Sequence, residues 1–222
     1  MKRTIIFITA IVLLSCSGCN TEKKNIQSVN PDGIELHIEP GAHWQEKMKG
    51  FIFNANKTPQ IAAWIEDNNG NYISTVTVTN RSAKEKWRGS PIEGRPEALP
   101  VWYHKIQNNA GEIDTVTAAS SKKPVDVQID NNSLINGNEY NIYLEINQSY
   151  DYNDFWTENN SGVNGQPSII YHAKFIAGKS DSIKLNTIGY GSVDGSDGII
   201  NPGLEKITTA LLIIKDAYII VN

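Results

Sequence analysis

Short runs in which apolar and polar residues alternate are the strongest constraint on the fold of this chain. In GIELHIEP, residues 33–40, an aliphatic side chain occupies every second position. Successive side chains of a β-strand point to opposite faces of its sheet, so this run predicts a strand with one buried and one solvated face. The expected inward residues are Ile34, Leu36 and Ile38, and the expected outward residues are Glu35, His37 and Glu39.

The clearest hairpin is QIAAWIEDNNGNYISTVTVTN, residues 60–80. Two β-rich runs flank Asn68, Asn69 and Gly70, and an Asn-Gly pair tolerates the positive φ that tight hairpin turns require. Further strands are expected in PVDVQID, NEYNIYLEINQS, PSIIYHAKFIA, DSIKLNTIGYG and ALLIIKDAYIIVN, with turns at 136–137 and 164–165. The last of these runs is nearly all apolar, which favours a central place in its sheet.

About eight strands, separated by turn signals and without amphipathic helices between them, predict a single antiparallel β-sandwich of the immunoglobulin type over residues 33–222. One segment departs from the strand pattern. In PEALPVWYHKIQ, residues 96–107, we expect a short helical insertion that begins at Pro100 and has Trp102 and Ile106 on one face.

The first residues indicate export from the cytoplasm. Two basic residues precede an apolar run, residues 5–14, which is too short to span a hydrocarbon core of about 30 Å. Small residues and cysteines follow at once, and this start resembles a bacterial lipoprotein signal, in which a peptidase cuts before a cysteine that is then acylated. Cys16 has a leucine three residues before it, whereas Cys19 follows a small Ser-Gly pair, so both stay candidates. We expect a signal peptide over residues 1–18, a flexible tether over 19–32, and a lipid anchor on the periplasmic or cell-surface side of the envelope.

Cysteine content and charge exclude several classes of function. Both cysteines lie in the signal segment, so residues 33–222 hold no disulfide, thiolate metal site or cysteine nucleophile. Loss of Lys2 and Arg3 with the signal leaves 18 basic residues (20 − 2) against 24 acidic ones, a net charge of −6. Nucleic-acid binders need clustered lysine and arginine, so we expect no nucleic-acid partner.

Four segments occur in an order that resembles a known family. They are AAWIEDNNGNYISTVTV, the aromatic KWRG…LPVWYHK region, DTVTAAS and GQPSIIYHAKF. Together they resemble predicted periplasmic proteins of domain-of-unknown-function family 2271, over most of the chain from about Gly33 to the C-terminus. The resemblance implies an immunoglobulin-like sandwich related to a flagellar hook-capping domain, and it implies no established activity.

Members of that family commonly carry Asp-x-x-Thr-Gly-Ala-Thr where this chain has DTVTAAS, residues 114–120. The pattern resembles the target of bacterial flavin transferases, which join the FMN half of FAD through a phosphoester to the last hydroxyl. By this resemblance Asp114, Thr117 and Ala119 match, and Ser120 is the acceptor. Ala118 replaces the usual glycine and restricts φ. The address would have to lie on an exposed loop; the alternative is an ordinary connector.

Several tryptophans and a tyrosine have two possible uses. Trp87, Trp102 and Tyr103 lie near DTVTAAS and can stack on an isoalloxazine ring, or they can close one end of the sandwich. Trp44 and Trp156 can form a sugar- or protein-binding face, or they can pack in the core.

No sequence motif indicates an enzyme or a metal site. The histidines His37, His43, His104 and His172 show no ligand spacing among themselves. SYDYNDFW and SVDGSDG contain oxygen ligands of the type that calcium prefers, but they lack the spacing of a calcium loop and read as turns. A nucleophile elbow, a phosphate-binding glycine loop and a defined carboxylate pair are all missing from the sequence.

Two main functions follow. The first is a binding or assembly module of the cell envelope without a catalytic centre, whose contact with the membrane is the lipid anchor. The alternative is a redox carrier with covalent FMN, which would need a flavin transferase and a redox partner. An enzyme acting on envelope polymers is a distant third.

Overall fold

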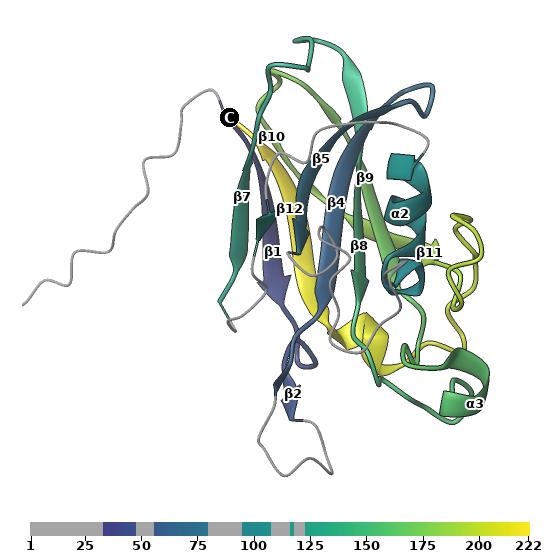
Figure 1. The fold of residues 1–222 in the computed structure, drawn as a ribbon. Coiled ribbons are helices and arrows are strands. Elements are labelled where there is room, and N and C mark those ends of the chain that lie inside the picture. The colour runs from purple at the N-terminus through teal and green to yellow at the C-terminus, as the bar shows by residue number, and fades with distance from the viewer. Residues whose placement is uncertain (1–32, 48–55, 80–94, 108–115, 118–122) are drawn as a thin grey trace, which may run out of the picture.

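The computed structural model describes residues 33–47, 56–79, 95–107, 116–117 and 123–222. These residues form two sheets packed face to face, with a short helix on the outside of the larger one (Figure 1). The predicted antiparallel β-sandwich with a short helical insertion is therefore confirmed. Within these ranges, no helix is long and apolar enough to cross a membrane.

The smaller sheet has four antiparallel strands in the order β10-β12-β1-β7. Their bounds are β1 Ile34–Pro40, β7 Val125–Ile129, β10 Asp181–Lys184 and β12 Ile214–Val221. In β1 the three aliphatic residues are buried and the residues between them are partly exposed, as the alternation predicts. The C-terminal strand β12 lies between β10 and β1, so its predicted central position is confirmed.

The larger sheet has the order β11-β9-β8-β4-β5-β6, and its first five strands are antiparallel. Their bounds are β4 Gln60–Asp67, β5 Tyr72–Thr79, β8 Glu139–Asn147, β9 Ile169–Ile176 and β11 Asn186–Tyr190. The two-residue β6, Val116–Thr117, pairs in parallel with β5 at the edge. The β4–β5 hairpin turns at Gly70, whose φ of 80° is the positive value that the sequence predicts. A separate two-residue ladder joins β2, Glu46–Lys47, to β3, Asn56–Lys57.

One expected strand is in fact two. DSIKLNTIGYG contributes β10 to the smaller sheet and β11 to the larger one. Leu185 lies between them, is 2% exposed, and donates its backbone N–H to the Ala217 carbonyl at 2.9 Å. Burial of this leucine in the core lets the chain cross from one sheet to the other, which a single β-rich run in the sequence does not reveal.

The larger sheet is covered on both faces. Its inner face packs against the smaller sheet in the main core. Its outer face carries a second apolar cluster, in which Trp64 and Ile170 pack with Val101 and Trp102 of the helix α2, Pro100–Gln107. Because both faces are buried, seven of the eight residues of β4 are buried, without the alternation seen in β1. The helix begins at Pro100, as predicted, after a short 3₁₀ helix over Pro96–Ala98.

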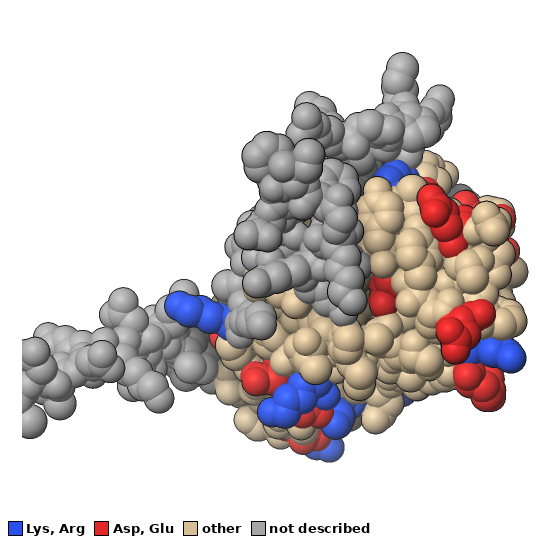
Figure 2. Space-filling model, turned by 90° about the horizontal axis from the view of Figure 1, so that it is seen from below, with Lys and Arg blue, Asp and Glu red and all other residues tan. Residues whose placement is uncertain are grey.

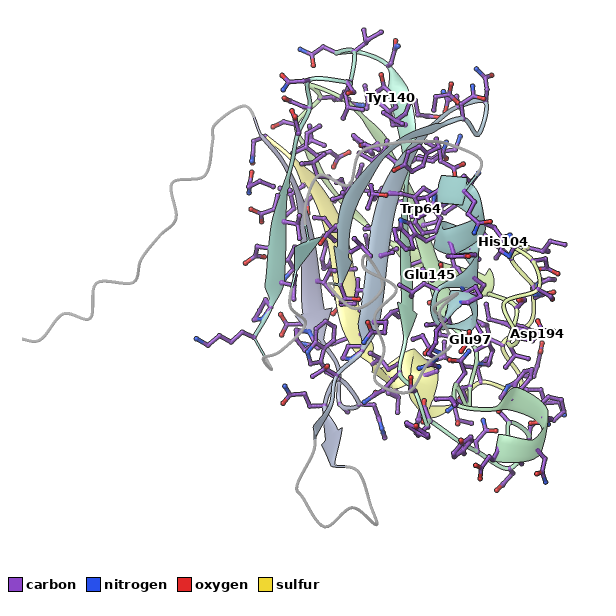
Figure 3. The ribbon with its side chains drawn as sticks, viewed as in Figure 1. Trp64, Glu97, His104, Tyr140, Glu145 and Asp194 are labelled. Atoms are coloured by element: carbon purple, nitrogen blue, oxygen red, sulfur yellow. The ribbon has the colours of Figure 1, made fainter. Side chains whose placement is uncertain are left out.

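A buried carboxylate fixes the start of α2 on the sheet. Glu145, on the outer face of β8, is 0% exposed and lies between the sheet and the helix (Figure 3). Its carboxylate accepts the backbone N–H of Val101 at 3.2 Å, the backbone N–H of Trp102 at 2.8 Å and the hydroxyl of Ser168 at 2.6 Å. The first N–H groups of a helix have no partner within it, and the helix dipole favours negative charge at that end. Pro100 has no N–H, so Glu145 satisfies the remaining free donors of the first turn.

The segment after β11 closes over the same point. A Cβ at Gly191 would lie 2.6 Å from Pro100 Cγ and 2.6 Å from Ser168 Oγ, so only glycine permits this approach without a shift. Further along, the ring Nε2 of His104 and the carbonyl of Gly195 form a hydrogen bond of 3.0 Å. The helix is therefore enclosed between the sheet and residues 191–198.

We predict that Glu145 makes the stability of the protein depend on pH near neutrality. Burial raises its pKa from 4.5 to about 7, against the lowering effects of the bonds from Ser168, Trp102 and Val101. The folded state then binds this proton more tightly than the unfolded state, so stability falls as pH rises from 4.5 through about 7. For a pKa shift of this size, the free energy of unfolding falls by roughly 3 kcal/mol over this pH range. Glu145→Gln cannot ionise, so its urea unfolding free energy should fall less between about pH 5 and about pH 8.

The matched control is Glu139→Gln, because Glu139 is a surface carboxylate that pairs with Lys174. This variant should keep the pH dependence of the wild type. Equal pH slopes for wild type and Glu145→Gln would contradict the assignment.

Candidate functional site

Most residues of the predicted flavin address lie outside the described residues. The predicted site residues without a structural description are Cys16, Cys19, Trp87, Asp114, Ala119 and Ser120. Thr117 is placed by its backbone in β6, where it pairs with Thr79 of β5. The DTVTAAS stretch thus contributes two residues to the edge of the larger sheet, whereas an address was expected on a loop.

The aromatic residues of α2 are occupied by packing. Trp102 is 2% exposed, and its indole N–H donates to Thr75 Oγ1 at 3.0 Å. Tyr103 is partly buried against the same cluster and meets His104 edge to face, with ring centroids 5.6 Å apart. Trp102 therefore presents no open ring face to a flavin. Trp44 is also fully buried in the main core, as the packing alternative expects.

A row of rings crosses the outer face of the larger sheet beside α2. Tyr143 stacks on Trp64 with centroids 5.2 Å apart and lies 4.7 Å from the ring of His172. Nε2 of His172 is 2.9 Å from the amide oxygen of Asn141. Burial, and next the charge of Lys174, lower the pKa of His172. Neutral His172 is therefore a packed and hydrogen-bonded residue, which is a structural role.

Among the described residues, the exposed aromatic side chains gather instead in the connection between β8 and β9. We call residues 150–163 the aromatic loop; it includes the one-turn helix α3, Glu158–Ser161. Tyr150, Tyr152 and Phe155 are 45%, 36% and 44% exposed, and Trp156 is partly buried against the main core. Sequence reasoning singled out only Trp156 and considered SYDYNDFW for its oxygen ligands. The useful signal was the density of aromatic residues in that run.

The side chain of Asn153 holds the loop in shape. Its amide oxygen accepts the backbone N–H groups of Phe155 at 2.9 Å and Trp156 at 2.7 Å. Its amide nitrogen donates to the Lys206 carbonyl at 3.0 Å and to Thr208 Oγ1 at 3.1 Å. One side chain therefore shapes the turn that carries Phe155 and ties it to the segment before β12.

One backbone bond and one side-chain bond join the two ends of the loop. The N–H of Tyr150 donates to the Val163 carbonyl at 2.7 Å, and the hydroxyl of Tyr152 donates to the Gly162 carbonyl at 2.8 Å. Thr157 and Asn160 form a capping box at the start of α3. Tyr150 has a φ of 62°, the one positive value at a non-glycine residue among those described. A backbone state that is rare for tyrosine persists only where its surroundings hold it.

The exposed rings lie among polar groups. Phe155 meets Trp156 edge to face at 4.9 Å, and the Lys206 ammonium lies 4.8 Å from the Phe155 centroid. The Asp154 and Glu158 side chains are exposed beside them. Figure 2 views the molecule from the end at which Figure 1 shows α3, and the described surface there is largely uncharged, with a few acidic and basic groups, some of them adjoining. Rings set in such a surface can contact a ligand that has both apolar and hydroxyl faces.

We predict that Asn153→Ala loosens the aromatic loop while the sandwich stays folded. The variant loses four hydrogen bonds of one side chain, and each such bond contributes about 1 kcal/mol. Amide hydrogen exchange in residues 150–163 should accelerate at least tenfold, whereas exchange in β4 and β8 should not change. Asn159→Ala, an exposed change in α3, is the control and should leave exchange as in the wild type. Unchanged protection in Asn153→Ala would show that other contacts hold the loop.

Comparison of the chain with protein-family models, with curated proteins and with solved structures finds no match. The resemblance to domain-of-unknown-function family 2271 thus stays a prediction from the motifs quoted above. The sandwich architecture comes from the structure itself.

Proposed function

We propose that this protein is a lipid-anchored binding module of the cell envelope and that the aromatic loop contacts its ligand. The observation that carries the proposal is the set of three exposed rings on a loop fixed by side-chain and backbone hydrogen bonds. The lipoprotein-type start of the sequence supports the anchor. The proposal includes no catalytic centre.

The exposure of these rings favours a role in binding rather than in the stability of the fold. Apolar surface that remains in contact with water contributes nothing to folding, and clusters of it commonly mark interaction sites. Rings held rigidly in advance lose little conformational entropy when a ligand binds. The bonds of Asn153 and the closed ends of the loop provide this rigidity.

The chemistry of the loop fits a carbohydrate. The C–H faces of a sugar ring pack against flat aromatic rings, and its hydroxyls bond to carboxylate and amide groups. The loop presents both kinds of group to solvent: Tyr152, Phe155, Asp154, Glu158 and Asn159 are all exposed. An anchored envelope protein would meet such polymers at the cell surface or in the periplasm.

We predict that the wild-type protein sediments with insoluble glycans and that Tyr150→Ala/Phe155→Ala weakens this binding about five- to thirtyfold. Loss of ring stacking should reduce the binding free energy by about 1–2 kcal/mol. The probes are purified peptidoglycan, chitin and cellulose, and the measurement is the bound fraction as a function of glycan concentration.

Ile135→Ala is the matched control, because Ile135 is 65% exposed and belongs to the β7–β8 connection rather than to the aromatic loop. Its binding should equal that of the wild type. The carbohydrate proposal fails if no glycan is bound, or if the double variant binds as the wild type does. Loop-dependent capture of an envelope protein without glycan binding would instead indicate a protein ligand.

The redox carrier with covalent FMN is the second candidate. Its support is the family resemblance of DTVTAAS. Among the described residues, Val116 and Thr117 form a two-residue ladder at an edge of the larger sheet, whereas the address requires an exposed loop.

We predict for this candidate that co-expression with a flavin transferase adds the mass of one FMN to the chain, and that the mass survives denaturation because the phosphoester is covalent. Ser120→Ala should abolish the addition and leave thermal unfolding unchanged. Ser121→Ala is the adjacent control and should still be modified. An unmodified wild-type chain, measured as intact mass beside a transferase that modifies a known target, would leave DTVTAAS as a connector.

A further inference from the structure

The outward face of β1 brings ionisable residues together with those of its neighbours. Glu35, His37 and Glu39 alternate on this face, away from the main core. The register of the smaller sheet places His37 directly opposite Asp126 on β7. It also places Glu35 opposite Gln128, whose amide donates to the Glu35 carboxylate.

The distances within this group are short. His37 Nδ1 lies 2.5 Å from Asp126 Oδ1, and His37 Nε2 lies 3.7 Å from Glu39 Oε2. One ligand atom each of Glu35, His37 and Asp126 can be chosen so that all three lie within 4.8 Å of one another. Glu35 and His37 are two residues apart on β1 and share its outward face. Sequence alone does not reveal that Asp126 joins them, because β1 and β7 are far apart in the chain.

Negative charge is in excess around the imidazole. Partial burial, and next the charge of Asp126, raise the pKa of Glu35, while His37 and Gln128 lower it. The ammonium of Lys184, on the same sheet, is bound to Asp216 of β12. The carboxylates of Glu35 and Asp126 both lie near the imidazole of His37. A cation placed between these two carboxylates would reduce their mutual repulsion.

We propose that Glu35, His37 and Asp126 form a binding site for a divalent transition-metal ion of the zinc class. Imidazole nitrogen with carboxylate oxygen suits zinc and its first-row neighbours. Zinc lies about 2.0–2.2 Å from such ligands, so its ligands in a tetrahedron are about 3.4 Å apart. The ligand atoms now lie within 4.8 Å of one another, and the closest pair, His37 Nδ1 and Asp126 Oδ1, is 2.5 Å apart. Side-chain rotations would widen this pair and close the longer separations to that value. Three protein ligands leave a fourth position for water.

A metal ion at this site would link the edge strand β7 to its neighbour β1 in the smaller sheet. Within the described part of the chain, β7 is the last strand of the smaller sheet and pairs with β1 alone. An ion held by Asp126 of β7 and by two residues of β1 would connect these strands through their side chains. Binding to the folded state alone stabilises that state, so zinc should raise the unfolding temperature.

The test is calorimetric titration of the full chain with zinc chloride, using metal-free protein prepared in detergent and without a polyhistidine tag. We expect one zinc ion per chain at this site and a thermal midpoint that rises with zinc. His37→Ala should lose both effects. Asp126→Asn keeps the shape of the side chain but removes its charge, and it should bind zinc at least tenfold more weakly.

His43→Ala is the control, because His43 lies beyond the end of β1 and outside the three-residue group; its binding should equal that of the wild type. Every variant retains Cys16 and Cys19, so any zinc held by thiols appears equally in all of them. The proposal is overturned if wild type and His37→Ala bind the same number of ions with the same affinity. It is also overturned if the wild type binds none while its circular dichroism shows a folded sandwich; the imidazole would then be a partner of Asp126 and Glu39 only.

Discussion

The contact between the Glu145 carboxylate and the first turn of α2 underlies the architecture of the outer layer. A carboxyl group in the middle of a sheet must be hydrogen-bonded when it is covered, and here two backbone N–H groups and one hydroxyl surround it. The same contact fixes where α2 begins and how closely residues 191–198 can pass over it. With the helix in place, Trp64, Ile170 and Trp102 form a second core outside the sandwich. The larger sheet is thereby buried on both faces, and β4 becomes an interior strand of the whole molecule.

The local structure could be predicted well from the sequence, whereas the contacts between distant segments could not. Alternation identified β1, Asn69-Gly70 identified the β4–β5 hairpin, and Pro100 marked the start of α2, because each signal lies within a few residues. Glu145 falls within an alternating run, where an acidic residue reads as solvent-facing; only the helix laid over it by the fold makes it a buried anchor. The split of DSIKLNTIGYG likewise depends on Leu185 entering a core that other strands supply.

The candidate sites show the same limit. The aromatic loop could have been recognised by its density of rings, but their exposure depends on how Asn153 folds the turn. The group around His37 depends on the pairing of β1 with β7, which no local pattern encodes. In our proposals the sandwich acts as a rigid support, with the carbohydrate surface on the β8–β9 connection and the metal site on the outward face of the smaller sheet. The flavin address depends on residues of DTVTAAS outside the described ranges, and it remains a prediction from the family resemblance.

The most direct test of the central claim is an NMR titration of the Glu145 side-chain carboxyl together with the backbone amides of Val101 and Trp102. The buried anchor predicts a carboxyl pKa of about 7, with both amide resonances shifting over the same pH range because they donate to the titrating group. A Glu145 carboxyl that titrates near its ordinary value of 4.5, with no response from either amide, would contradict the account.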